Sequence, residues 1–289
     1  MKDKVSNVYV LFSLLSIVVM VIAQLTATVV YLLPLHDAIA NILSGCIALI
    51  LAYFLLKALN AKLLKVDFAF SRIPTIRFKP IWILSAFVLP IFVSALFFIF
   101  PGQFTNNNLP LDKKFTVLTS AVMLAGISAG VIEEVVFRGI IMTALEKRWN
   151  RTIAIFVPSV LFAVLHVLGR QLDFSSVLLL LISGTCVGVL FSLITIQSGS
   201  IWNSVIVHVV WNTIVIGGIV TIGTTNSPDS MYSYVLDSRS LFLTGGDFGI
   251  EASSISIAGY IVFSMLALFL MRRHPSLHTE PNGKRQNEE

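Results

Sequence analysis

Charged residues are scarce in this chain: 12% of its 289 residues are Asp, Glu, Lys or Arg, whereas about 25% is typical of a soluble domain. Hydrophobic residues make up 56% of the sequence. This balance excludes an ordinary soluble globule and predicts a polytopic membrane protein. Cysteine is also rare. Cys46 and Cys186 lie in separate apolar runs, which excludes a disulfide framework and indicates two small buried hydrophobes.

The chain has few long polar stretches. Most of it consists of eight apolar stretches, each with a length close to the ~20 residues that a transmembrane helix needs. Their approximate ranges are 8–33, 38–59, 81–100, 115–145, 152–169, 175–197, 201–222 and 255–272. The sequence lacks the alternation of a β-barrel, so helices must satisfy the backbone hydrogen bonds in lipid. We therefore expect an all-α polytopic membrane protein, a bundle of about eight transmembrane helices with an intramembrane polar cavity.

Residues 1–273 are expected to form a single transmembrane domain, with its chemistry in residues 115–222. The polar tail 274–289 is expected to be disordered and cytoplasmic. The outer segment 223–254, rich in Ser, Thr, Gly and Asp, is the longest candidate for an unstructured loop. The segment 57–80 mixes basic and aromatic residues, and it fits an interfacial helix or a basic loop equally well.

Basic residues are distributed unevenly between the two sides of the predicted bundle. With the N-terminus inside, fifteen fall in cytoplasmic segments, namely Lys2, Lys4, Lys57, Lys62, Lys65, Arg72, Arg77, Lys79, Lys147, Arg148, Arg151, Arg272, Arg273, Lys284 and Arg285. The outer segments hold four, namely Lys113, Lys114, Arg170 and Arg239. This asymmetry predicts that both termini are cytoplasmic. The net charge of +5 could suggest that the protein binds nucleic acid, but this uneven distribution of the basic residues argues against that function.

A few ionisable residues nevertheless lie inside three of the apolar stretches. An ionisable group in hydrocarbon costs at least a few kcal/mol, so such groups are rare and usually functional. Counted from the cytoplasmic ends of their helices at about 1.5 Å per residue, the polar groups of three helices lie ~12–21 Å deep, in a single layer. This layer contains Glu133, His166, His208 and Asn212. Scattered structural residues have no reason to coincide in depth.

Spacing along the helices suggests a role for each polar residue. Glu134 and Arg138 are four residues apart, so they can form an ion pair within the helix. Glu133 points about 100° away from this pair and is free to face a cleft, where a carboxyl group suits general acid–base chemistry. His208 and Asn212 share one face and offer an imidazole and an amide, which can donate hydrogen bonds to a developing oxyanion.

Each of these features also has an ordinary structural explanation. A single buried histidine is more often a hydrogen-bonded structural group, and an in-helix ion pair is most simply structural. The pairs Gly126/Gly130 and Gly184/Gly188 fit the close packing of membrane helices. The common depth of the polar groups and their complementary chemistry favour a site within the bilayer.

Three motifs occur in order on these helices. Residues 133–138 have the form E-E-x-x-x-R, residues 162–166 the form F-x-x-x-H, and residues 208–212 the form H-x-x-x-N. The ordered set resembles the motifs of the type II CAAX prenyl endopeptidases and their bacterial relatives, the CPBP or Abi family. The resemblance covers about 80 residues, and the flanking spans match the family only in general character.

The resemblance implies an intramembrane protease, here of the bacterial type and in the plasma membrane, whose cavity is reached from the cytoplasm. It implies that Glu133 and His166 activate a water molecule, while His208 and Asn212 hold the oxyanion. Phe162, one turn before His166, is expected to stack against it, and the Glu134–Arg138 pair is expected to support the site. The turn 197–200 is expected to form part of the rim of the cavity.

A metal-free mechanism is favoured, because the sequence lacks the H-E-x-x-H helix typical of zinc proteases. The alternative is a divalent metal such as Zn²⁺ bound by Glu133, His166 and His208. The expected substrate is a membrane-associated peptide or protein, in bacterial peptide maturation, bacteriocin self-immunity or CAAX-type processing. Two other functions stay open: a proton-coupled secondary transporter, and a non-catalytic membrane immunity or scaffold protein.

Overall fold

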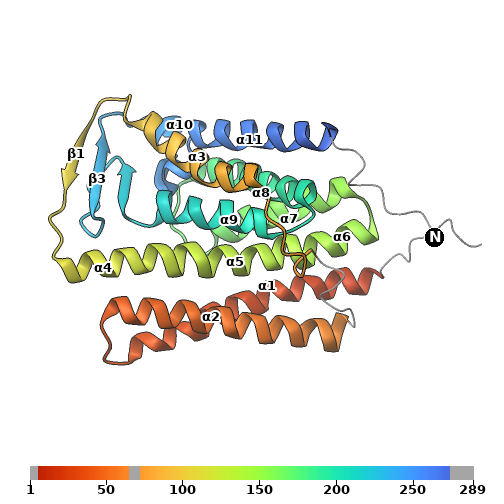
Figure 1. Cartoon of the computed structure of the whole chain (residues 1–289). Coiled ribbons are helices and arrows are strands. Elements are labelled where there is room, and N and C mark those ends of the chain that lie inside the picture. Colours follow the sequence, from red (N-terminus) through yellow and green to blue (C-terminus); the bar gives the residue numbers. More distant parts are fainter. Residues whose placement is uncertain (1–5, 65–71, 274–289) are drawn as a thin grey trace, which may run out of the picture.

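The computed structural model describes residues 6–64 and 72–273, and helices make up most of them (Figure 1). The N-terminal part holds α1 (Asn7–Ala27), η1 (Thr28–Leu32), α2 (Asp37–Leu59), η2 (Asn60–Leu64), α3 (Pro80–Phe97) and β1 (Gly102–Asn106). The central part holds α4 (Leu111–Thr119), η4 (Ser120–Ser128), α5 (Ala129–Glu134), η5 (Val135–Ile141), α6 (Met142–Arg148), α7 (Arg151–Val167) and α8 (Phe174–Ser198). The C-terminal part holds α9 (Trp202–Trp211), η6 (Asn212–Ile216), β2 (Val220–Gly223), β3 (Tyr232–Leu236), α10 (Leu241–Thr244), η7 (Gly246–Phe248), η8 (Ile250–Ala252) and α11 (Ser254–Arg273).

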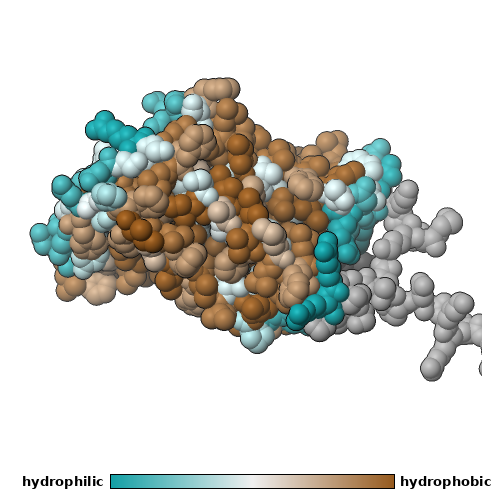
Figure 2. Space-filling model, turned by 90° about the horizontal axis from the view of Figure 1, so that it is seen from above, coloured by the Kyte–Doolittle hydropathy of each residue, from teal (hydrophilic) through white to brown (hydrophobic). Residues whose placement is uncertain are grey.

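Within the described residues, six helical segments are long and apolar enough to cross a membrane. They are Asn7–Leu32, Asp37–Leu63, Pro80–Phe97, Leu111–Arg148, Phe174–Ser198 and Ser254–Arg273. Two shorter apolar helices, Arg151–Val167 and Trp202–Ile216, correspond to the other two predicted spans. Hydrophobic residues cover the middle of the surface and hydrophilic residues cover both ends (Figure 2). The prediction of an all-α polytopic membrane protein is confirmed.

The two ends of the bundle differ in charge and structure (Figure 1). At one end, the basic end, α2, α6 and α11 finish while α3 and α7 begin. Its described basic residues are Lys57, Lys62, Arg72, Arg77, Lys79, Lys147, Arg148, Arg151, Arg272 and Arg273. At the other end, the sheet end, β1, β3 and β2 form a sheet in that order, with β1 antiparallel and β2 parallel to β3.

The segment 223–254 is folded rather than unstructured, so the prediction for it was wrong. It contains β3, α10, η7 and η8. The segment is polar overall, but a few apolar side chains hold it against the bundle. Tyr234, Leu236 and Ile250 are buried in a cluster with residues of α3, α8 and α9. This folded segment covers the sheet end of the bundle.

Local signals set the ends of the helices around the polar layer. The side chain of Asn150 accepts a hydrogen bond from the Ile153 amide at 2.9 Å, which caps the start of α7. Asp173 does the same for α8, accepting from the Ser176 amide at 2.8 Å. Gly199, with φ of 74°, ends α8 in the left-handed conformation that glycine adopts without steric cost.

Glycines let the helices that carry the motifs approach closely, as predicted. A Cβ atom on Gly130 would lie 2.8 Å from Val209 Cγ2, and one on Gly188 would lie 2.7 Å from Ser159 Cβ. Both distances are too short for a real side chain. The prediction that these glycines pack helices together is therefore confirmed, and the contacts bring α5 against α9 and α8 against α7.

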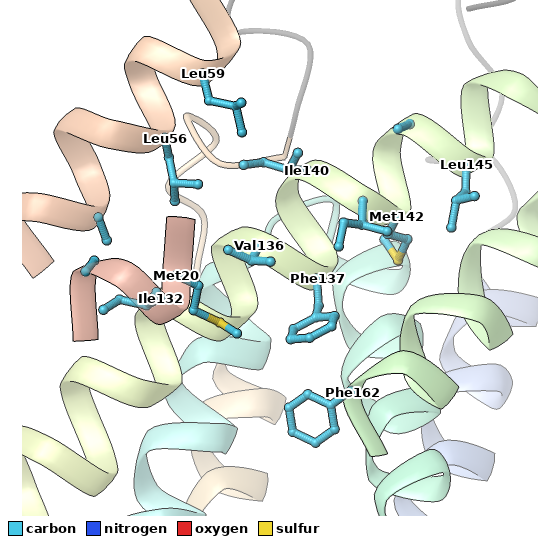
Figure 3. Close-up of a cluster of buried hydrophobic side chains, with 14 of the residues drawn as sticks. Met20, Leu56, Leu59, Ile132, Val136, Phe137, Ile140, Met142, Leu145 and Phe162 are labelled. Atoms are coloured by element: carbon cyan, nitrogen blue, oxygen red, sulfur yellow. The ribbon is translucent and has the colours of Figure 1, made fainter. Parts of the chain in front are cut away.

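Apolar side chains from α1, α2, η5 and α7 fill the core beside the polar layer (Figure 3). The rings of Phe137 and Phe162 meet edge to face, with their centroids 5.4 Å apart. Burial of a side chain of this size contributes roughly 1.5–3 kcal/mol. These two rings fix α7 against the helix that bears the glutamates.

Two predictions concern segments that are only partly described. The tail 274–289 lies outside the described residues. Of the segment 57–80, residues 65–71 also lie outside them. Residues 72–79 contain no helix, and they pack over the turn between α8 and α9, where the Trp202 indole donates to the Ile73 carbonyl at 2.8 Å. Residues 72–79 are therefore a packed loop and not an interfacial helix, whereas residues 57–64 belong to the helical segments α2 and η2.

Candidate active site

A cavity of about 200 Å³ lies between the helix 111–148 and helices α7, α8 and α9. Glu133, His166, His208 and Asn212 all line it. The helix that carries Glu133 is irregular here, because the short α-helical segment α5 lies between the π-helical segments η4 and η5. Such π-helical turns often occur at functional sites. The structure thus brings the four predicted catalytic residues into one cavity.

The ion pair predicted between Glu134 and Arg138 is confirmed. Arg138 Nη1 donates to Glu134 Oε1 at 2.8 Å, and both side chains are fully buried. Arg138 Nη2 also donates to the Gly188 carbonyl at 3.0 Å. The guanidinium carbon lies 5.0 Å from the centroid of the Phe162 ring and 5.2 Å from that of Phe191. These contacts replace the water that a buried cation loses.

Glu134 has a second partner that the sequence did not predict. Its Oε1 atom lies 3.1 Å from Nδ1 of His208. A carboxylate only accepts hydrogen bonds, so Nδ1 carries the proton in this contact. Nε2, on the other side of the ring, then faces Oε2 of Glu133 at 3.8 Å. Phe191 stacks on the imidazole, with centroids 4.7 Å apart and an interplanar angle of 21°. Glu134 and Phe191 therefore orient His208 between the two glutamates.

Glu133 differs from its neighbour in exposure and partners. Its side chain is 14% exposed, compared with 0% for Glu134. Its buried Oε2 atom has no hydrogen-bond partner among the described residues; the same holds for Oε2 of Glu134, but Glu134 does not line the cavity. A buried polar atom without a partner calls for an explanation. In a polar cavity, an unpartnered carboxylate oxygen is suited to take a proton from water.

His166 is fixed by the turn of helix that precedes it. Its Nδ1 atom lies 2.8 Å from the carbonyl oxygen of Phe162. Because a carbonyl only accepts, Nδ1 carries the proton, and Nε2 is left as a hydrogen-bond acceptor. The Phe162 ring lies beside the imidazole with centroids 4.4 Å apart, which confirms the predicted contact.

Asn212 joins η6 to the helix that bears the glutamates. Its Nδ2 atom donates to the carbonyl oxygen of Ala125 at 2.8 Å, and the residue is 8% exposed. A side-chain amide has two N–H groups, so this bond fixes the orientation of the amide and leaves the second N–H for another acceptor.

Residues from the sheet end, unassigned by the sequence analysis, also line the cavity. They include Arg170, Trp211, Phe248, Glu251 and Tyr260. The Arg170 guanidinium lies over the Phe248 ring, 4.7 Å from its centroid. Glu251 lies outside the spanning helices, and the pKa of its carboxyl group is raised to about 7. Burial is the main cause, the charge of Arg170 opposes the rise, and the charge of Glu133 adds to it. Phe248 and Glu251 had no recognisable signal, because the segment 223–254 was read as a loop. Trp211 and Tyr260 lie in predicted spans, where nothing distinguished them from residues of the core.

The cavity is completed by residues of the sheet end and not by the turn 197–200. Gln197 Oε1 accepts a hydrogen bond from Trp82 Nε1 at 2.8 Å, and the Ser200 hydroxyl donates to the Thr75 carbonyl. The turn is thereby covered from the basic end. The expectation that this turn forms part of the rim was wrong, because residues 72–82 pack over it. Access to the cavity from the cytoplasm stays a prediction.

Metal binding stays a prediction. Among the residues that the structure describes, no group of three or more His, Cys, Asp or Glu side chains is arranged to hold a metal ion. The alternative ligand set, Glu133, His166 and His208, comes from three separate helices that share the cavity.

Comparisons with known proteins agree with the motifs. Residues 115–214 match the family described as Type II CAAX prenyl endopeptidase Rce1-like. The chain is also 23% identical over 142 residues to a protein of Bacillus subtilis (strain 168) named "Putative membrane peptidase YdiL". This alignment covers 47% of the chain and 54% of the relative, about half the length of each. No solved structure matches the chain.

The matched region begins within the helix that carries the glutamates and ends just after Asn212. It therefore contains all three motifs and every one of the predicted catalytic side chains in the cavity. The resemblance drawn from the motifs is confirmed: residues 115–214 match the Rce1-like, type II CAAX prenyl endopeptidase family, and the chain is similar to a putative membrane peptidase.

Proposed function

We propose that the chain is an intramembrane endopeptidase that hydrolyses a peptide bond of a membrane-associated protein or peptide, with Glu133 as the general base. The observation that carries this proposal is the difference in surroundings between two adjacent glutamates. Glu134 is neutralised by Arg138, while the Oε2 atom of Glu133 is buried without a partner in the cavity that His166 and His208 share.

The proposed reaction follows from the proton positions. Glu133, assisted by the free Nε2 of His166, removes a proton from water, and the water oxygen attacks the carbonyl carbon of the peptide bond. The resulting oxyanion accepts hydrogen bonds from His208 and from the second N–H of Asn212. Glu133 then returns its proton to the departing amine as the carbon–nitrogen bond breaks. In this step His208 donates to the oxyanion through Nε2, so that its ring carries a proton on both nitrogens.

In this mechanism Glu134 and Arg138 are positioning residues. Glu134 holds Nδ1 of His208, which sets the direction of Nε2, and Arg138 keeps Glu134 ionised. The metal-free form is our proposal. In the alternative form, Glu133, His166 and His208 would hold a divalent ion such as Zn²⁺, which would activate the water in place of the carboxylate.

The substrate class follows from the side on which the cavity is completed. With the positive-inside orientation and cytoplasmic termini, the sheet end faces the outside of a bacterial plasma membrane. Substrates that present a peptide bond at the outer side, as in peptide maturation or bacteriocin self-immunity, fit this arrangement better than CAAX-type processing at the cytoplasmic side.

The test is Glu133→Gln, which keeps the shape of the side chain and removes the base. Newly formed peptide termini in membranes of expressing cells, measured by mass spectrometry, identify cleaved bonds. Cleavage of a peptide spanning such a bond by the purified protein should fall at least about a hundredfold. Glu146→Gln, on the same long helix but paired with Arg72 away from the cavity, is the control and should retain activity.

Four outcomes would contradict the proposal. Retention of full activity by Glu133→Gln would remove this residue as the base. Loss of activity on chelation, restored by one zinc ion per chain, would replace the metal-free mechanism by the metal form. Proton flux in liposomes without any cleaved peptide would favour the transporter, and an intact phenotype in the variant would favour a non-catalytic scaffold.

A further inference from the structure

A second cavity, of about 550 Å³, lies on the other side of the helix that carries the glutamates. Its walls include Ala52 and Leu56 of α2, Val131 of α5 and Val135 of η5. Val131 and Val135 are four residues apart and share a face of the helix, whereas Glu133 faces the opposite cavity. Figure 3 shows how closely Leu56 lies to this helix. One helix thus separates a polar cavity from an apolar one.

The apolar cavity lies at the surface that faces lipid. Tyr53, which lines it, is 54% exposed, and Phe54 beside it is 61% exposed. Toward the basic end the cavity is bounded by Ile73 and by the Trp202 indole, which are hydrogen-bonded to each other. The cavity is therefore reached from the side, through the lipid-facing surface of α2.

One positively charged side chain lies in the wall of the apolar cavity. Of the described residues that line the cavity, Lys57 alone is charged, and its Nζ atom lies 5.6 Å from the centroid of the Tyr53 ring. Lys57 is exposed and belongs to the last turn of α2, at the basic end. Lysine, tyrosine and tryptophan are the side chains that membrane proteins place at the level of the lipid headgroups.

We propose that this cavity binds one acyl chain of an anionic phospholipid, whose headgroup pairs with Lys57. The volume falls within the range of about 300–1,000 Å³ that is usual for small-molecule sites. An apolar cavity that opens to a bilayer is filled by the hydrocarbon around it. The cation beside Tyr53 selects a negatively charged headgroup, because anionic lipids collect at basic segments. The bound chain contacts the helix that carries Glu133 on its far face.

Trp202 provides a direct measurement of occupancy. The protein is reconstituted into phosphatidylcholine vesicles that contain phosphatidylglycerol brominated in its acyl chains, and the quenching of tryptophan fluorescence is recorded. We expect a saturable quenching component that disappears in Trp202→Phe. Phosphatidylcholine with the same brominated chains should give this component at about fivefold higher lipid concentration, the effect of one lysine at an anionic surface.

Two pairs of variants separate a specific site from general lipid contact. Ala52→Phe places a ring in the cavity and should remove the saturable component, whereas Ala58→Phe, at an exposed position of the same helix that does not line the cavity, should leave it unchanged. Lys57→Gln should abolish the preference for the anionic lipid, and Lys62→Gln, an exposed lysine one turn further on, should keep it.

The proposal fails if anionic and zwitterionic lipids quench Trp202 at equal concentrations, because the cavity would then accept any chain. It also fails if Ala52→Phe is quenched like the wild type. Should Ala52→Phe not fold, the lysine pair still decides the matter. None of these readouts depends on proteolysis, so the site stands or falls separately from the proposed function.

Discussion

The two faces of the helix that carries the adjacent glutamates place them in opposite situations. Glu134 is fully buried and shares one oxygen between Arg138 and His208, while Glu133 lines the cavity, is 14% exposed and has no arginine partner among the described residues. Two identical side chains, neighbours in sequence, are thus separated by about 100° of helix rotation into a fixed charge and an available one. The contrast teaches that position on the helix, rather than residue type, distinguishes the proposed base from its support.

The largest effect is expected from Glu134→Gln. This substitution removes the negative charge at residue 134 and leaves the charge of Arg138 buried without a counter-charge. Such a loss typically lowers the free energy of unfolding by about 3–5 kcal/mol. Activity should fall as well, because His208 loses the partner of its Nδ1 atom. Thermal unfolding in detergent measures the first effect, and cleavage below the unfolding temperature measures the second.

The control for Glu134→Gln is an ion pair at the basic end. Arg72 and Glu146 lie 2.6 Å apart, but each side chain is 22% exposed, so Glu146→Gln should cost at most about 1 kcal/mol. If the two variants unfolded at the same temperature, the distinction between a buried and a solvated glutamate would lose its basis.

The next prediction is a tenfold difference in the rate of thiol labelling between cysteines placed at the two ends of the polar layer. In a background without Cys46 and Cys186, Ile216→Cys should react with a thiol reagent at least about tenfold faster than Val205→Cys. Ile216 lines the cavity and is 45% exposed, whereas Val205 is 5% exposed. Such a rate ratio corresponds to roughly 1.4 kcal/mol of accessibility.

Sealed cells extend this measurement to the orientation of the chain. A membrane-impermeant reagent added outside should label Ile216→Cys and should not label Ile76→Cys, which is 71% exposed at the basic end. Labelling of Ile76→Cys alone would invert the orientation inferred from the basic residues, and the proposed outer-side substrates would be ruled out.

The sequence was sufficient for the features that depend on spacing along one helix. Hydropathy located the spans, the i,i+4 spacing predicted the pair of Glu134 with Arg138, and the glycine spacing predicted the close contacts at Gly130 and Gly188. These features follow from helical geometry alone, which the sequence determines directly.

Contacts between distant segments could not be predicted in this way. The bond from His208 to Glu134 depends on how α9 lies against α5, and the position of Glu251 depends on how a polar segment folds over the sheet end. The role expected for the turn 197–200 failed for the same reason. It was estimated from depth along separate helices, while the contacts that cover this turn come from residues 72–82, which are distant in sequence.

The smallest effect concerns Glu251, the second carboxyl group that lines the cavity. Its pKa in the folded protein is raised to about 7 from the ordinary value of 4.5, through burial and the charge of Glu133, against the opposing charge of Arg170. The folded state therefore binds more protons than the unfolded state between these two values. Stability should be greatest below the unfolded pKa and should fall as pH rises through about 7.

A shift of this size corresponds to at most about 3 kcal/mol, and partial exposure of the residue reduces the expected loss between pH 5 and 8 to about 1–2 kcal/mol. Glu251→Gln cannot ionise, so its melting temperature should lack this fall, while Asp229→Asn, at an exposed position of the sheet end, should melt with the pH dependence of the wild type. Equal pH dependence in wild type and Glu251→Gln would show that Glu251 is solvated like an ordinary surface acid. Glu133 would then be the one shielded carboxyl group among the described residues that line the cavity, and its contrast with the ion-paired Glu134 would be sharper still.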